Sequence, residues 1–237
     1  MDRDYIIDTI SDTHNKHGRL KLKGGDLLLH SGDISSRGRP EEIAQFVDWL
    51  ELQEYTNIVW IPGNHDFGLE KDFLFWKEKC DQRGIHLLND SGVTIDGIKI
   101  WGSPIQPWFH DWAFNRLRGT DIQKHWDLIP NDTEILITHG PPHGILDRVR
   151  ATYGGNQGEN VGCERLAVKI KQTNAKLHVF GHIHEARGQL VQDGVLYVNA
   201  SSLDHYYSFV NPGYTRVIKD LAGNYKVQEE TEATFES

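Results

Sequence analysis

Five short stretches of the chain, between residues 12 and 184, carry side chains that can ligate metal ions. They are Asp12-Thr13-His14, Gly32-Asp33, Gly63-Asn64-His65-Asp66, Thr138-His139-Gly140 and Gly181-His182-Ile183-His184. Each stretch follows a run of apolar or β-branched residues that predicts a strand. Because residues at the carboxyl ends of parallel strands converge on one crevice, the five stretches predict a single site.

The donors in these stretches exceed what one metal ion can use. The candidate ligands are Asp12, His14, Asp33, Asn64, His139, His182 and His184. Two ions about 3.5–4 Å apart would use them all, and that is the spacing of dinuclear sites that cleave phosphoesters. If each ion takes four protein donors, Asp33 must bridge. Nitrogen and oxygen donors without sulfur favour Mn²⁺, with Fe or Zn²⁺ as alternatives.

The third stretch also predicts proton chemistry. His65 follows the candidate ligand Asn64 in a turn and points elsewhere, so it can donate a proton during catalysis. We expect Asp66 to orient the His65 imidazole and raise its basicity, as carboxylates beside metal sites do. The alternative is an ordinary Asx turn capped by Asn64.

The elements that must position these residues alternate between strand and helix in the first half of the chain. Strand-like runs lie at residues 5–10, 26–30, 58–61, 85–88, 93–95, 98–101, 134–138, 177–180, 189–192, 195–199 and 215–219, and helical patterns begin at Pro40 and cover residues 70–81 and 162–173. Asp96-Gly97 predicts a type I′ hairpin, and therefore an antiparallel section. We expect an α/β fold, an αββα sandwich of two mixed sheets, in a single domain of residues 1–237 with a frayed tail from about residue 228.

Residues 103–127 are rich in aromatic and polar side chains without a regular period, which predicts a long loop near the site. Trp108, Phe109 and Trp112 are candidates to stack against a substrate, although each could simply pack the loop down. Arg37 and His143 are further candidates for substrate contact, and an exposed loop arginine is the alternative for Arg37.

The composition limits the classes of partner. The chain has 237 residues and a net charge of −9, which argues against non-specific nucleic-acid binding and a stable nucleic-acid complex. An anionic substrate must therefore be attracted locally, by bound cations. Cys80 and Cys163 fit no metal or disulfide motif. The sequence contains no signal peptide and no apolar run long enough for a membrane span, so we expect a cytoplasmic protein. It does not indicate the oligomeric state.

The order D-x-H, G-D, G-N-H-[DE], H, G-H-x-H resembles that of the calcineurin-like metallophosphoesterase superfamily. Further runs are similar to the metallophosphoesterase-domain-containing family, which includes cyclic-nucleotide and other phosphodiesterases. These runs are Trp101-Gly102-Ser103-Pro104, Gln106-Pro107-Trp108-Phe109, Thr138-His139-Gly140-Pro141-Pro142, Val179-Phe180-Gly181-His182-Ile183-His184-Glu185 and Asn199-Ala200-Ser201. The resemblance implies that one metal is held by Asp12, His14 and His184, and the other by Asn64, His139 and His182, with Asp33 between them. It also implies that His65 is the acid.

The resemblance implies a hydrolase that uses two divalent metals and a bridging hydroxide to cleave phosphoesters. The expected substrate is a small phosphodiester such as a cyclic nucleotide. A phosphomonoesterase or a nuclease is the enzymatic alternative, and a non-catalytic protein-binding scaffold is the alternative of another class. Ser36 stands where some superfamily phosphatases have a second aspartate, which argues against protein-phosphatase activity.

Overall fold

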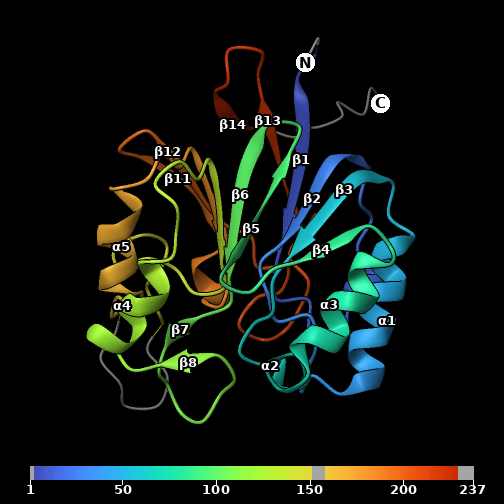
Figure 1. The fold of residues 1–237 in the computed structure, drawn as a ribbon, viewed down its shortest axis with the longest axis horizontal. Helices are drawn as coiled ribbons and strands as arrows, with labels where there is room; N and C mark the ends of the chain where they lie inside the picture. Colours follow the sequence, from blue (N-terminus) through green and yellow to red (C-terminus); the bar gives the residue numbers. More distant parts are fainter. Residues whose placement is uncertain (1–2, 151–157, 229–237) are drawn as a thin grey trace, which may run out of the picture.

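Two six-stranded sheets pack face to face in the computed structural model, which describes residues 3–150 and 158–228 (Figure 1). The first sheet has the order β14-β13-β1-β2-β3-β4. Its strands are β1 (Tyr5–Ile10), β2 (Gly25–His30), β3 (Tyr55–Trp60), β4 (Ile85–Leu87), β13 (Thr215–Lys219) and β14 (Tyr225–Val227). Strands β1 to β4 are parallel, whereas β13 runs antiparallel to β1. The expected frayed tail beyond residue 228 lies outside the described residues.

The second sheet has the order β11-β12-β10-β9-β6-β5. Its strands are β5 (Ser91–Ile95), β6 (Ile98–Ser103), β9 (Ile135–Thr138), β10 (Leu177–Phe180), β11 (Gly188–Gln192) and β12 (Val195–Asn199). The four inner strands are parallel, and β5 and β11 are antiparallel at the two edges. Asp96 and Gly97 join β5 to β6 with φ values of 50° and 80°, as the predicted type I′ turn requires. The predicted αββα sandwich with mixed sheets is confirmed.

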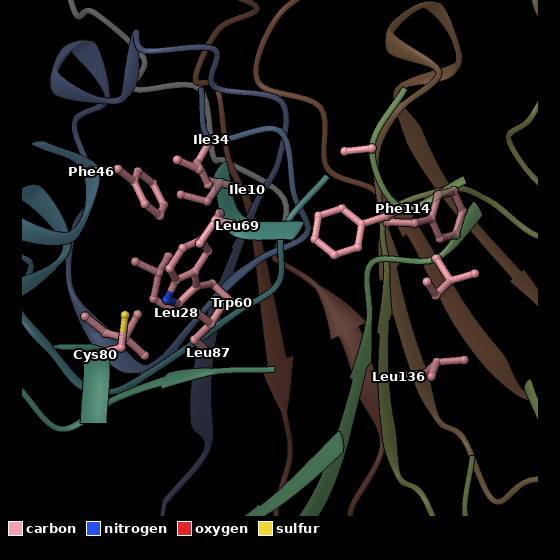
Figure 2. Close-up of a cluster of buried hydrophobic side chains, with 14 of the residues drawn as sticks. Ile10, Leu28, Ile34, Phe46, Trp60, Leu69, Cys80, Leu87, Phe114 and Leu136 are labelled. Carbon is pink, nitrogen blue, oxygen red and sulfur yellow. The ribbon is translucent and has the colours of Figure 1, made fainter. Parts of the chain in front are cut away.

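The alternation of side chains along each strand divides the buried apolar residues into two clusters. Leu27 and Leu29 of β2 face the second sheet, in a cluster built from the inner faces of both sheets. Leu28 points the other way, and Figure 2 shows it near Phe46 and Trp60 in a cluster on the helix side. Because the central strands are covered on both faces, most of their residues are apolar, and the polar exceptions in β1 and β10 are the buried Asp8, Thr9 and His178.

Helices cover the outer face of each sheet, with α1 to α3 on one side of the molecule and α4 and α5 on the other (Figure 1). The helices are α1 (Pro40–Glu51), α2 (Phe67–Lys71), α3 (Phe73–Asp81), α4 (Thr120–Trp126) and α5 (Glu164–Ile170), with 3₁₀ turns at His17–Arg19 and His184–Ala186. The helix predicted over residues 70–81 is divided, because Asp72 leaves helical geometry with φ −123° and ψ 40°. Among the described residues, every helix is too short or too polar to span a lipid bilayer.

The region 103–127 is more regular than the sequence predicts. It contains two short strands, β7 (Gln106–Pro107) and β8 (Asn115–Arg116), and then helix α4. Ile122 and Trp126, one helical turn apart, are fully buried, which explains why this helix forms. The expectation of one long irregular loop is therefore wrong for residues 120–126, because a helix of two turns carries too few apolar positions to show a period.

Candidate metal centre

The five predicted stretches follow β1, β2, β3, β9 and β10, at the carboxyl ends of neighbouring parallel strands. The two sheets meet at this end through an isolated bridge between Ser11 and Ser201. Across the same junction, the His182 amide donates to both carboxylate oxygens of Asp12, at 3.1 and 3.0 Å. Residues from both sheets therefore form one centre.

The backbone at several candidate ligands is strained. Asp12, His14, Asp33 and His182 have φ values of 52°, 41°, 56° and 70°, a region that residues with a Cβ seldom adopt. Such conformations persist where the surrounding structure enforces them, and they cluster at functional sites. Here each one turns the chain sharply at a strand end.

Gly181 allows the two sheets to approach closely at the centre. A Cβ built on Gly181 would lie 2.0 Å from Asp12 Oδ2 and 2.2 Å from Ser11 Oγ, both well inside contact distance. The glycine that precedes the two histidines is therefore required for packing beside Asp12.

The first cluster consists of Asp12, His14 and His184. His14 Nδ1 donates to the Ser35 carbonyl at 3.2 Å, and His184 Nδ1 donates to the Asp204 carbonyl at 3.0 Å. Both imidazoles therefore turn Nε2 inward, and the two Nε2 atoms are 3.4 Å apart. Two neutral imidazoles in this arrangement point lone pairs at each other, which a cation between them relieves.

The second cluster consists of Asp33, His139 and His182, with Asn64 beside it. His139 Nδ1 donates to the Ser31 carbonyl at 2.9 Å, so its Nε2 also faces inward. That Nε2 lies 2.9 Å from Asn64 Oδ1 and 3.4 Å from Asp33 Oδ2. Imidazole nitrogen, carboxylate oxygen and amide oxygen converge here as a donor set that suits a divalent transition metal.

Asp33 connects the two clusters. Its Oδ2 lies 3.4 Å from His139 Nε2 in the second cluster and 3.7 Å from His14 Nε2 in the first. Its other oxygen, Oδ1, accepts the His65 amide at 2.8 Å, which fixes the carboxylate in place. The clusters are thus consistent with a dinuclear metal site in which Asp33 is shared.

The electrostatics of the centre favour positive charge although it is buried. Burial alone would lower the pKa of His139, but the Asp33 carboxylate raises it to about 9. Burial likewise opposes charge on His184, and Asp12 raises the pKa of that imidazole to about 9. For His14 the burial effect dominates and lowers the pKa to about 4, which leaves a neutral imidazole of the kind that binds metals.

The expected contact between Asp66 and His65 is wrong. Asp66 is fully buried and accepts hydrogen bonds from the Ser35 amide and hydroxyl at 3.1 and 2.6 Å, and from the Gly63 amide at 2.8 Å. His65 Nδ1 instead donates to the Ser36 carbonyl at 3.0 Å. Asp66 therefore holds the loop after Asp33, and the carbonyl of that loop orients the His65 imidazole.

Two of the predicted aromatic residues lie at the centre. The Trp112 ring is 4.3 Å from the His65 ring between centroids, and the Phe109 ring is 5.7 Å from that of His182. Arg37 contacts the centre only indirectly. Its guanidinium lies 5.3 Å from the centroid of the Trp112 ring.

Two other substrate candidates have no described contact with the centre. Trp108 is 53% exposed, and the ring contacts found among residues 3–150 and 158–228 do not include it. His143 is also exposed, and its Nδ1 lies 3.7 Å from the Asp147 carboxylate. Their predicted substrate contacts stay predictions.

Two further residues support the centre: Ser201, to which the sequence assigned no role, and Asn199, which was a candidate to line the cleft. Ser201 Oγ lies 2.9 Å from Asp12 Oδ2 and 2.8 Å from Asn199 Oδ1, and these two acceptors share its one hydroxyl proton. Asn199 in turn donates to the Ile183 carbonyl at 2.9 Å, between the two histidines of the last stretch. The run Asn199-Ala200-Ser201 was the available signal, because it follows the next parallel strand, β12.

Comparisons with known proteins agree with this geometry. A family model described as calcineurin-like phosphoesterase matches residues 5–186. Metallophosphoesterase domain-containing protein 1 of Homo sapiens is 36% identical over 225 residues, covering 86% of this chain and 68% of that protein. A 3′,5′-cyclic-nucleotide phosphodiesterase of Nostoc sp. is 28% identical over 175 residues, covering 68% of this chain and 56% of that protein.

The fold is also shared with a solved structure of phosphopantetheinyl hydrolase from Mycobacterium tuberculosis. The TM-score is 0.53 at 17% identity, with 82% of this chain and 88% of that chain covered. The matched region includes all five candidate metal-binding stretches, from Asp12 to His184. The chain belongs to the calcineurin-like metallophosphoesterase family.

Proposed function

We propose that this protein is a dinuclear metal-dependent phosphodiesterase that hydrolyses small phosphodiesters such as cyclic nucleotides. The observation that carries the proposal is the position of His65, whose Nε2 lies 3.9 Å from Asp33 Oδ2. Asp33 Oδ2 is the atom near imidazole nitrogens of both clusters. An acid in that position can protonate the oxygen that leaves phosphorus, which a diester with a poor alkoxide leaving group requires.

In the proposed reaction, a water oxygen forms a bond to phosphorus while the bond to the leaving oxygen breaks. Two bound divalent ions would activate that water at neutral pH and offset the charge of the phosphoryl oxygens. The Ser36 carbonyl accepts the Nδ1 proton of His65, so the leaving oxygen takes its proton from Nε2. The Asp33 carboxylate accepts the His65 amide and so fixes the position of the His65 backbone relative to the two clusters.

Three further observations support a small diester as the substrate. Trp112 lies against the His65 imidazole, where it can stack on the leaving group. The net charge of −9 does not suit a long polyanion. The Nostoc relative is named as a cyclic-nucleotide phosphodiesterase.

Other parts of the proposal rest on composition and topology. Mn²⁺ is the proposed native metal because the donors are nitrogen and oxygen. Residues 1–237 are proposed to act as one domain, since the first sheet combines β1 with β13 and β14. The small diester is the proposed partner, and the cytoplasmic location stays a prediction.

The test is a metal titration of metal-stripped protein. Hydrolysis of bis-p-nitrophenyl phosphate and bound Mn²⁺ are measured together, and activity should rise as the second equivalent binds. Faster hydrolysis of p-nitrophenyl phosphate would instead assign a phosphomonoesterase. Two bound metals without turnover of either compound would favour the scaffold.

A variant pair tests the acid. His65→Ala should lower turnover of a cyclic nucleotide about 100- to 10,000-fold, because proton transfer to its alkoxide leaving group is lost. Both metals should remain bound, and loss of metal from this variant would contradict the assigned role. His86→Ala, in β4 outside the clusters, is the matched control.

A further inference from the structure

The loop between β12 and β13 places a tyrosine directly on the first metal cluster. The Tyr207 ring centroid lies 4.9 Å from that of His14 and 5.3 Å from that of His184, both in edge-to-face geometry. Tyr207 is nevertheless 43% exposed. The ring thus borders the cluster and keeps part of its surface open to a bound molecule.

The backbone of Tyr207 is held in a costly conformation. Its φ is 59°, which is an outlier for a bulky residue. Its amide donates to the Asp204 carbonyl at 2.8 Å, and its own carbonyl accepts from Lys16 Nζ at 2.5 Å. Since the Asp204 carbonyl also accepts from His184 Nδ1, one loop both orients a candidate ligand and presents the ring. Strain of this kind is retained at ligand clamps.

The neighbouring tyrosine shows that the placement is specific. Tyr206 is 77% exposed, and its ring lies 3.9 Å from that of His205, a residue outside the metal clusters. The two tyrosines share one loop and similar chemistry, but the described contacts connect only Tyr207 to candidate ligands. Tyr206 is therefore a matched control for any effect of the loop itself.

Tyr207 and Trp112 border different parts of the centre. Trp112 contacts the ring of His65, the proposed acid, whereas Tyr207 contacts the rings of His14 and His184. Because His65 protonates the leaving oxygen, the leaving group lies on the Trp112 side. The His14 ring also lies 4.7 Å from the His65 ring between centroids, so one phosphodiester can reach both aromatic side chains, and the ester group that stays on phosphorus would then lie on the Tyr207 side.

We propose that Tyr207 is a specificity-determining residue that packs against the retained ester group and favours a planar, apolar group there. The inference rests on the proposed phosphodiesterase activity, and it adds the part of the diester that is recognised. A phenyl group would bury more area against Tyr207 than a methyl group does. It would also form an aromatic pair, which a methyl group cannot.

The test uses two diesters with the same leaving group, p-nitrophenyl phenyl phosphate and methyl p-nitrophenyl phosphate. Wild type should have the lower KM for the phenyl diester. Tyr207→Ala should raise that KM about tenfold and the KM of the methyl diester less than about threefold. Tyr207→Phe should keep the preference, and Tyr206→Ala should match wild type in both KM values. An equal change for both diesters in Tyr207→Ala would overturn the inference.

A binding measurement separates this inference from the proposed function. Phenyl phosphate and methyl phosphate, the products that carry the retained group, are titrated into Mn²⁺-loaded protein by calorimetry. Phenyl phosphate should bind wild type about tenfold more tightly than it binds Tyr207→Ala, with metal content equal in the two proteins. If wild type cleaves neither diester, the proposed function fails. The difference in phenyl phosphate affinity between wild type and Tyr207→Ala still decides whether Tyr207 contacts the phenyl group. Equal affinities would exclude the contact.

Discussion

Two aspartates, one within β1 and one just beyond its carboxyl end, are both completely buried, and their surroundings differ. Asp8, within β1, accepts hydrogen bonds from Arg216 Nε at 2.8 Å and Nη2 at 2.7 Å, and from the Tyr55 hydroxyl. Arg216 also donates to the Gly24 carbonyl at 2.7 Å. A permanent cation of the chain itself therefore balances the Asp8 carboxylate.

Asp12, just beyond the end of β1, has no such permanent cation among its described partners. Its carboxylate accepts from the His182 amide and from Ser201 Oγ, and it faces His184 Nε2 at 3.3 Å. Against the effect of burial, Asp12 raises the pKa of His184 to about 9, so a proton on that imidazole offsets the carboxylate, and a metal that binds His184 must take the place of this proton. One buried carboxylate therefore completes the fold, whereas the other makes a place for a ligand.

The same Asp→Asn change should have different effects at the candidate metal centre and at the Asp8–Arg216 pair. In Asp33→Asn, the charge shared by both clusters is lost, while asparagine still tolerates the left-handed backbone. Turnover of bis-p-nitrophenyl phosphate should fall at least about a thousandfold, since metal catalysis supplies several kcal/mol. The second equivalent of Mn²⁺ should also be lost. Full metal binding with normal turnover would show that Asp33 is not shared.

Asp8→Asn should instead act on stability. Removing the carboxylate leaves the buried part of Arg216 without its charge partner, and we expect unfolding to become easier by about 3 kcal/mol. Urea unfolding of the metal-free protein measures this difference, with Asp33→Asn as the comparison. Loss of bound Mn²⁺ in folded Asp8→Asn would contradict the separation of the two sites.

Bound metal should stabilise wild type through the candidate metal centre only, and not through the Asp8–Arg216 pair. At free Mn²⁺ about 100 times its dissociation constant, the free energy of unfolding should rise by about 2.7 kcal/mol for each site filled. Thermal or urea unfolding with and without Mn²⁺ measures the gain. Asp8→Asn should show the same gain from its lower starting point, and a smaller gain there would mean that the two regions are coupled.

The smallest effect is expected at the hydroxyl beside Asp12. Ser201→Ala removes one hydrogen bond to Oδ2, and the affinity for one Mn²⁺ should fall about 10- to 100-fold. Calorimetric titration measures the change. Ser202→Ala is the control, because Ser202 Oγ donates to the Gly213 carbonyl and not to a candidate ligand. Equal losses in both variants would indicate a general disturbance of the loop.

Much of the fold could be predicted because its signals are local. The apolar runs Leu27-Leu28-Leu29 in β2 and Ile58-Val59-Trp60 in β3 identify buried parallel strands, and Asp96-Gly97 identifies the hairpin. The short helix α4 and the break at Asp72 could not be predicted in this way. Both depend on which side chains the sheet beneath them accepts.

At the candidate site, the sequence by itself determined the types of donor, their order and their location at strand ends. Side-chain chemistry and strand periodicity are enough for that, since the topology of parallel strands brings their ends together. It could not identify the partners that orient those donors. The carbonyls of Ser35, Ser36 and Asp204 carry no side-chain signal, because every residue has one.

Only the tertiary structure decided that Asp66 holds the Ser35 loop and that Tyr207 borders the first cluster. The contact of Tyr207 joins residues 14 and 207, and that of Asp66 joins residues 35 and 66. Their geometry depends on how loops of different strands pack. No periodicity within one segment contains that information, because both contacts exist only after loops from different parts of the chain have packed together.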